Sequence, residues 1–206
     1  MAVSFPALFV SHGAPDLPLA DCPARDFLAR LGQRLPSPDA ILIISPHWMT
    51  SVPTLATASE MRAIHDFGGF ARELYDLRYD APGFPDSLSR VVRSLIKSAG
   101  FPIAADPSRG LDHGAWVPLL LMYPAATIPV AQLSLPAHWS PQKLMELGRA
   151  IAPLKSQNVL IVASGSATHN LRAFGGRSLN SSVPSWVSGF AQWLLNTVEN
   201  GDARQL

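Results

Sequence analysis

The chain has 206 residues, of which 48% are hydrophobic and 15% charged, a composition that predicts one folded domain with a substantial core and excludes a disordered chain. Its 16 basic and 15 acidic residues leave a net charge of +1, without the basic patch that binding to nucleic acid or to a membrane surface requires. Cys22 is the single cysteine, which excludes an internal disulfide and favours a cytoplasmic protein. The first residues lack the features of a signal peptide.

Apolar runs of strand length alternate with helical patterns along the chain. The predicted strands cover 6–11, 40–45, 128–135 and 158–163, with weaker ones at 53–57 and 101–105. The predicted helices cover 23–34, 85–99, 141–154 and 184–199, the last with Ser182 as its cap and Pro184 in its first turn. The main strands are apolar throughout, which is typical of strands that helices cover on both faces. The predicted fold class is therefore α/β, with a mostly parallel central sheet in three layers.

The segment from Gly114 to Ala137 carries no charged residue and resembles a membrane span in hydropathy. Four prolines interrupt it, and a continuous spanning helix of about 20 residues does not tolerate them. We predict instead a short buried helix from Val117 to Tyr123, followed by a buried strand from Ile128 to Leu135.

Three histidines each come just after a predicted strand. They are His12 in ALFVSHGAP, His47 in ILIISPHW and His169 in NVLIVASGSATHN. We expect Pro46 to break its strand and to project His47 beyond it. Because ligands bind at the carboxyl ends of the strands in an open α/β sheet, we expect the three imidazoles to meet at one edge. This pattern predicts an enzyme with a metal site and a proton-transfer site.

Two neutral imidazoles, from His12 and His47, suit Fe(II), Zn²⁺ or a similar ion. A catalytic metal usually has a third protein ligand, and for an oxygen-activating iron that ligand is expected to be a carboxylate. Asp16, Asp66 and Asp112 lie near the histidine motifs, but spacing does not choose between them.

Each histidine also has a structural interpretation. His169 is interpreted as a general acid and base or as a third metal ligand. His113 follows Asp112 and precedes Gly114, so it is either a substrate-contacting residue or half of a helix-capping pair. His65 lies in an aromatic, glycine-rich loop that either lines a pocket for a flat substrate or is purely structural. We expect His138 to be exposed and to have no function.

Six segments together resemble a known family. They are SHGAP (11–15), SPHW (45–48), HDFGGF (65–70), YDAPG (79–83), GLDHGAWVPL (110–119) and GSATHNL (165–171). They resemble, in the same order, motifs of the DOPA 4,5-extradiol dioxygenases, within the protocatechuate 4,5-dioxygenase-like (type II) extradiol enzymes.

The resemblance implies extradiol cleavage of a DOPA-like catechol by O2, beside the diol and not between its hydroxyls. It implies that His12 and His47 bind the metal, that His169 is the acid and base or a less certain ligand, and that His113 contacts oxygen or substrate. Fe(II) is the expected metal, with Zn²⁺ as the alternative. Four aromatic residues are candidates for the pocket wall, with plain core positions as the alternative: Trp48, Phe67, Phe70 and Trp116.

Family members usually continue for some fifty residues, in which a further histidine and acidic residues supply the remaining metal ligand. We therefore expect 1–206 to be a single extradiol-dioxygenase domain without that C-terminal segment. Two alternatives stay open at this point. One is a metal-chelatase or zinc hydrolase on a similar fold, and the other is a non-catalytic relative whose metal site is incomplete.

Overall fold

The computed structural model describes residues 5–173, 181–202 and 205. The chain divides into two compact units, Met1–Gly165 and Ser166–Leu206, and each is described by itself. The first unit holds the central sheet. The second begins directly after the last strand of that sheet.

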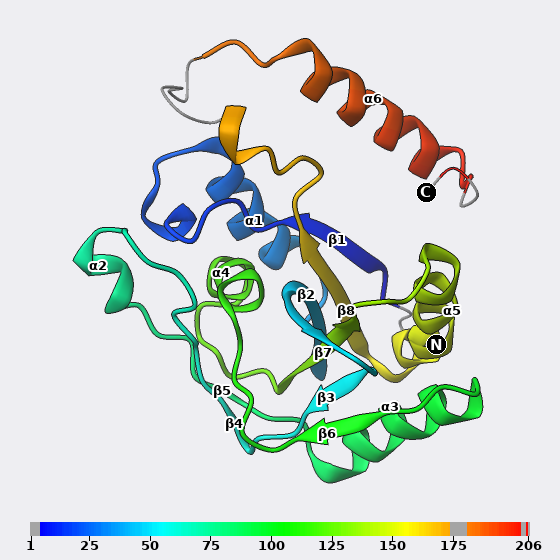
Figure 1. The fold of residues 1–206 in the computed structure, drawn as a ribbon. Coiled ribbons are helices and arrows are strands. Elements are labelled where there is room, and N and C mark those ends of the chain that lie inside the picture. The colour runs from blue at the N-terminus through cyan, green and yellow to red at the C-terminus, as the bar shows by residue number, and fades with distance from the viewer. Residues whose placement is uncertain (1–4, 174–180, 203–204, 206) are drawn as a thin grey trace. The chain divides into compact units, whose positions relative to one another are not determined.

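The central sheet has six strands in the order β1-β8-β2-β7-β3-β6 (Figure 1). Their bounds are β1 Ala7–Ser11, β2 Ala40–Thr50, β3 Thr54–Ala56, β6 Ala104–Asp106, β7 Val130–Pro136 and β8 Val159–Gly165. All neighbours run parallel except β3 and β7, which are antiparallel. The predicted strands and the mostly parallel sheet are confirmed. The antiparallel pair β4 (Glu60–Met61) and β5 (Ala81–Pro82) was not predicted, because two residues are too few to show a period.

Six α-helices occur in the described residues, four of them close to predicted positions. Their bounds are α1 Pro23–Arg34, α2 Arg72–Tyr75, α3 Asp86–Ser98, α4 His113–Met122, α5 Pro141–Ile151 and α6 Ser185–Glu199. Short 3-10 helices cover η1 Leu17–Leu19, η2 Ala152–Gln157 and η3 Leu171–Ala173. The predicted cap at Ser182 is wrong, since Pro184 holds the cap position of α6 and no side chain caps this helix.

Helices cover both faces of the sheet, as the side chains of β2 show. Ile41 and Ile43 belong to a buried cluster that includes residues of α1 and α4. Ala40 and Leu42 point the other way, into a cluster that includes residues of α3 and α5. The predicted three-layer α/β fold is therefore confirmed, and Figure 1 shows the two helix layers.

Two local predictions were wrong at positions that matter for the site. Pro46 does not break its strand, because β2 continues to Thr50 with a register shift between Ile44 and Met49, where a proline is tolerated. The helix predicted from Val117 begins earlier, at His113, and contains Pro118. Among the described residues, no helix is both long and apolar enough to cross a membrane.

Two helical glycines offer a matched test of the packing between α1 and α4. A Cβ atom on Gly32 would lie 2.0 Å from the carbonyl oxygen of Met122, whereas one on Gly148 would have no heavy atom within 4 Å. We expect Gly32→Ala to lower the free energy of unfolding by about 1–3 kcal/mol through overpacking. We expect Gly148→Ala to raise it by up to about 1 kcal/mol through helix propensity. Urea unfolding measures both, and equal effects would contradict the close approach of α1 and α4.

Candidate active site

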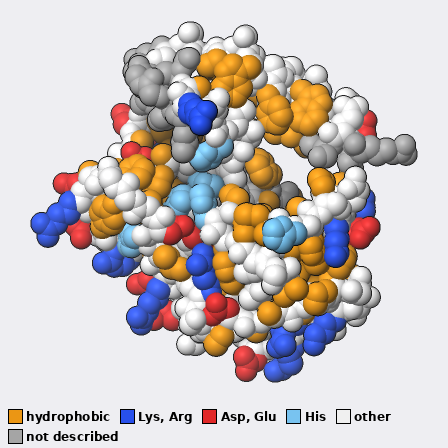
Figure 2. Space-filling model, in the orientation of Figure 1, with side chains coloured by type: hydrophobic (Ala, Val, Ile, Leu, Met, Phe, Trp, Pro, Cys, Tyr) orange, Lys and Arg blue, Asp and Glu red, His pale blue; other side chains and the backbone are white. Residues whose placement is uncertain are grey.

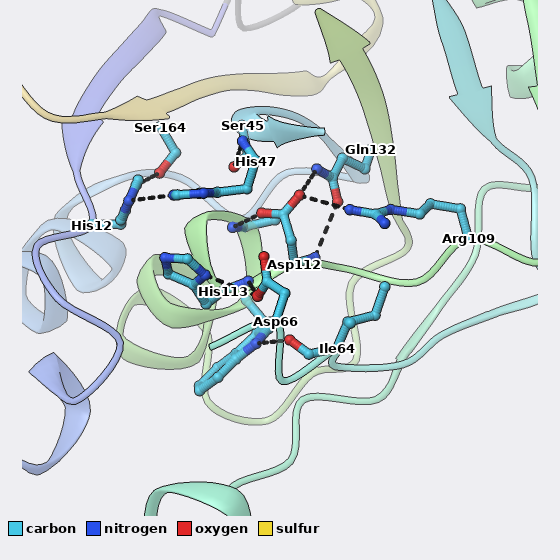
Figure 3. A network of polar contacts seen from close by, with 12 residues as sticks. His12, Ser45, His47, Ile64, Asp66, Arg109, Asp112, His113, Gln132 and Ser164 are labelled. Carbon is cyan, nitrogen blue, oxygen red and sulfur yellow. Dashed lines mark hydrogen bonds and ion pairs between the residues drawn. The ribbon is translucent and has the colours of Figure 1, made fainter. Parts of the chain in front are cut away.

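Three histidines from separate elements meet at the carboxyl edge of the sheet (Figure 3). His12 directly follows β1, His47 lies near the end of β2, and His113 is the first residue of α4. Since β8 pairs with both β1 and β2, the ends of these parallel strands lie at one edge. We call His12, His47 and His113 the histidine cluster.

The rings of the cluster are close enough for their nitrogens to approach one metal ion. The Nε2 atoms of His12 and His47 lie 3.2 Å apart, and one ring nitrogen from each of the three residues lies within 4.8 Å of the others. The ring centroids of His12 are 5.1 Å from His47 and 5.4 Å from His113. His47 and His113 are closer, at 4.0 Å with a 41° tilt.

These distances separate the roles of the three rings. Two imidazole nitrogens that bind one metal at about 2.1 Å, at an angle of about 90–110°, lie about 3.0–3.4 Å apart, with ring centroids about 4.5–5.2 Å apart. The pair His12 and His47 fits both values. The centroids of His47 and His113 are too close for this geometry, so these two rings pack on each other. The donor set therefore fits a first-row metal held by His12 and His47.

Backbone and hydroxyl groups orient His12 and His47. His12 is 2% exposed; its Nδ1 lies 2.9 Å from Ser164 Oγ, and its backbone N–H donates to the carbonyl of Gly165 at 3.2 Å. The backbone N–H of His47 donates to Ser45 Oγ at 3.2 Å. His47 itself is exposed, and Figure 2 shows histidine side chains reaching the surface of the molecule. The cluster is therefore buried on one side and accessible to small molecules on the other.

His113 is held by the carboxylate of Asp66. Asp66 Oδ1 accepts hydrogen bonds from the backbone N–H of His113 and from its ring Nδ1, both at 2.9 Å. Burial acts to raise the pKa of Asp66, but the hydrogen bonds from the ring and backbone of His113 outweigh it, so the pKa is lowered. Asp66 is thus an ionised carboxylate at neutral pH.

Asp112 forms a buried polar network beneath the cluster. Its carboxylate is 0% exposed and accepts from the backbone N–H of Ala115, from Arg109 Nη2 at 3.2 Å and from Gln132 Nε2. The guanidinium of Arg109 also lies 5.1 Å from the ring centroid of Trp48. This network caps α4 and joins its start to β7 and to the residue that follows His47.

None of the three aspartates considered from sequence belongs to the cluster. Asp66 and Asp112 are engaged as described, and Asp16 is exposed. The group that could hold a metal contains no carboxylate among the residues that the structure describes. The helix-capping interpretation near His113 is confirmed for Asp112.

The other histidines lie apart from this arrangement. His65 Nε2 lies 3.1 Å from the carbonyl of Leu77 and its ring packs near Trp116, as the structural interpretation requires. His138 is exposed, as expected. His169 belongs to the second unit, where it is exposed and lines a cavity of about 750 Å³ together with Arg172 and Trp186. Its predicted convergence with His12 and His47 therefore stays a prediction.

Aromatic residues border His113. The Phe67 ring meets the His113 ring edge to face, with centroids 5.8 Å apart, and Phe70 packs on Phe67. Trp48 and Trp116 are buried in the core, in line with the plain core alternative for these two residues. Phe67 is thus the aromatic residue that touches the cluster from the loop 65–70.

Ser164, Arg109 and Gln132 are site residues that the sequence analysis did not identify, and Asp66 was considered only as a metal ligand and not as the partner of His113. Each of these residues contacts a side chain or a ring at least 20 positions away in the sequence. Local spacing therefore does not predict these contacts. A faint signal exists for Asp66, which stands beside a histidine in the segment HDFGGF.

Comparison with known proteins places this geometry in a family. Residues 6–206 match the model described as the catalytic LigB subunit of aromatic ring-opening dioxygenase. The chain belongs to this family. A 4,5-DOPA dioxygenase extradiol from Beta vulgaris is 42% identical over 202 residues, which are 96% of this chain and 74% of that protein. The protein of the same name from Escherichia coli K12 is 39% identical, over 92% of this chain and 69% of that protein.

A solved structure agrees with the fold. The crystal structure of an uncharacterized protein from Escherichia coli K12 matches with a TM-score of 0.76 at 32% identity, covering 94% of this chain and 72% of that one. The predicted family, fold class and metal-dependent extradiol ring-opening activity are confirmed by these comparisons. None of the relatives described supports a chelatase, a hydrolase or a non-catalytic relative.

Gly114 tests how tightly the cluster is packed. A Cβ atom there would lie 2.3 Å from Ser45 Oγ, 2.8 Å from His47 Cδ2 and 3.2 Å from His12 Cε1. We expect Gly114→Ala to displace the two rings, to lower stability by about 1–3 kcal/mol and to weaken binding of Co²⁺. Calorimetric titration of the metal, with Gly148→Ala as the control for an added helical methyl group, measures the effect. Unchanged Co²⁺ affinity would show that the rings are not confined by α4.

Proposed function

We propose that this dioxygenase opens the ring of a catechol with O2 at a metal ion held by His12 and His47. The observation that supports the assignment is the 3.2 Å separation of their Nε2 atoms, which matches two ligands of one ion. We propose Fe(II) as that ion, with Zn²⁺ as the alternative, because neutral imidazoles suit both. Fe(II), when bound, supplies open coordination positions for both reactants and a path for electrons between them.

The residues around the metal position the substrate and move its protons. His113, beside the two ligands and paired with Asp66, contacts the oxygen atoms of the reactants. Phe67 provides an aromatic edge against which a flat ring packs. His169 takes a proton from a catechol hydroxyl and later returns one, as the family resemblance implies. It is also the candidate for a further, less certain metal ligand.

The proposed substrate is a DOPA-like catechol. The names of the relatives from Beta vulgaris and Escherichia coli specify 4,5-DOPA, and both are about two-fifths identical to this chain. Cleavage beside the diol gives a muconic semialdehyde-type product. A single catalytic domain over 1–206 and a cytoplasmic location complete the proposal, the latter resting on the single cysteine.

Histidine variants test the assigned roles. Fe(II) is added under anaerobic conditions, followed by catechols and O2, and the yellow ring-opened product is measured together with metal content. We expect His12→Ala and His47→Ala to lose the metal. We expect His169→Ala to keep the metal but to open the ring about 10²–10⁴-fold more slowly, as is typical when a general acid and base is removed. His138→Ala, at an exposed position, is the control and should behave as the wild type.

Two outcomes would change the proposal. Loss of the metal from His169→Ala would make His169 a ligand. Absence of coloured product with every catechol tested, from wild-type protein shown to contain the metal, would contradict the catechol assignment.

A further inference from the structure

One carboxylate oxygen of Asp66 receives two hydrogen bonds from the same residue. The backbone N–H of His113 and its ring Nδ1 both lie 2.9 Å from Asp66 Oδ1. The side chain of His113 is 10% exposed and that of Asp66 26% exposed, so the contact is partly buried. Figure 3 shows the His113 ring between the Asp66 carboxylate and the His12 side of the cluster.

This contact determines which ring nitrogen of His113 carries the proton. An ionised carboxylate only accepts hydrogen bonds, so Nδ1 must be the donor. In a neutral imidazole the other nitrogen, Nε2, is then an acceptor. The contact of His12 with Ser164 differs, because a hydroxyl both donates and accepts and leaves the His12 tautomer undetermined.

Asp66 is well placed for such a role because its loop is tied to the start of α4. Ile64 N–H donates to the carbonyl of Leu111 at 2.7 Å, and Leu111 N–H donates to the carbonyl of Arg62 at 2.8 Å. The indole N–H of Trp116 donates to the carbonyl of Ile64 at 3.0 Å. The residue after Asp66, Phe67, packs edge to face on the His113 ring. The loop therefore holds the ring by a hydrogen bond and by an aromatic contact.

We propose that Asp66 is a positioning residue, which holds His113 as the Nδ1–H tautomer and leaves Nε2 to accept a hydrogen bond from a substrate hydroxyl. This inference rests on the proposed function, since it assigns His113 the part of an acceptor toward the catechol. In this role Asp66 acts through His113.

Nitrogen NMR of the metal-free protein tests the tautomer directly. Histidine is labelled with ¹⁵N, spectra are recorded at mildly alkaline pH where imidazoles are neutral, and His113 is assigned by its loss in His113→Ala. We expect wild-type His113 to show a protonated Nδ1 and an unprotonated Nε2. Asp66→Asn, whose amide also donates, should shift His113 toward the Nε2–H form, and Asp66→Glu should restore the wild-type form in part.

Kinetics of the metal-loaded holoenzyme complete the test. We expect Asp66→Asn to lower kcat for catechol opening by about 10- to 100-fold with metal content unchanged, and Asp66→Glu to recover part of it. Asp86→Asn, an exposed carboxylate on α3, is the matched control. Thermal unfolding shows whether each variant is folded. If Asp66→Asn is unfolded, the tautomer of His113 in the wild-type spectrum and the kcat of Asp66→Glu still test the positioning role.

The results separate this inference from the proposed function. A wild-type His113 in the Nε2–H form, or an Asp66→Asn spectrum and kcat equal to those of the wild type, would overturn the positioning role while catechol cleavage stands. Wild-type protein that opens no catechol would overturn the proposed function and the part of His113 as an acceptor toward substrate, whatever the spectrum shows.

Discussion

The site depends on the close approach of the first turn of α4 to the carboxyl ends of β1 and β2. His12 and His47 arrive from the strands and His113 arrives from the helix, so any gap between these elements separates the imidazoles. Gly114 permits the approach, because a side chain there would occupy the space of the His47 ring. The fold therefore sets the spacing of the cluster through backbone packing, and the histidine side chains add the chemistry.

Burial of charge at the start of α4 reinforces this packing. Asp112 is removed from water and Arg109 is partly buried, and burial of the Asp112 charge is unfavourable unless its oxygens are hydrogen-bonded. Gln132 in β7, the Ala115 N–H in α4 and Arg109 donate to the Asp112 carboxylate, and the guanidinium of Arg109 lies over the ring of Trp48 in β2. A buried network of this kind adds little net stability, but it penalises any shift of the helix along the sheet. Its main effect is on the register of α4, and hence on the position of His113.

Sequence reasoning predicted most of the sheet because the main strands are long and apolar throughout. It also brought His12 and His47 to one edge, since the ends of neighbouring parallel strands meet by geometry alone. It placed the start of α4 four residues too late, although the cap is local, because the Asp112 side chain accepts from the backbone N–H of Ala115 and helix capping at Asp112 was one of two interpretations left open. The pairing of Asp66 with His113 spans 47 positions and has no periodic signal. Local pattern thus predicts elements and edges, whereas contacts between distant side chains need the folded chain.

The three imidazoles of the cluster are chemically unequal because their partners differ. His12 is buried and contacts a hydroxyl, His47 is exposed, and His113 faces an ionised carboxylate. The first two have the spacing of ligands on one ion, and the third packs on His47 with its Nδ1 already used. A metal centre with three identical ligands would not need such differences. They agree with the proposal that His12 and His47 bind the ion and that His113, held by Asp66 from the neighbouring loop, contacts the substrate.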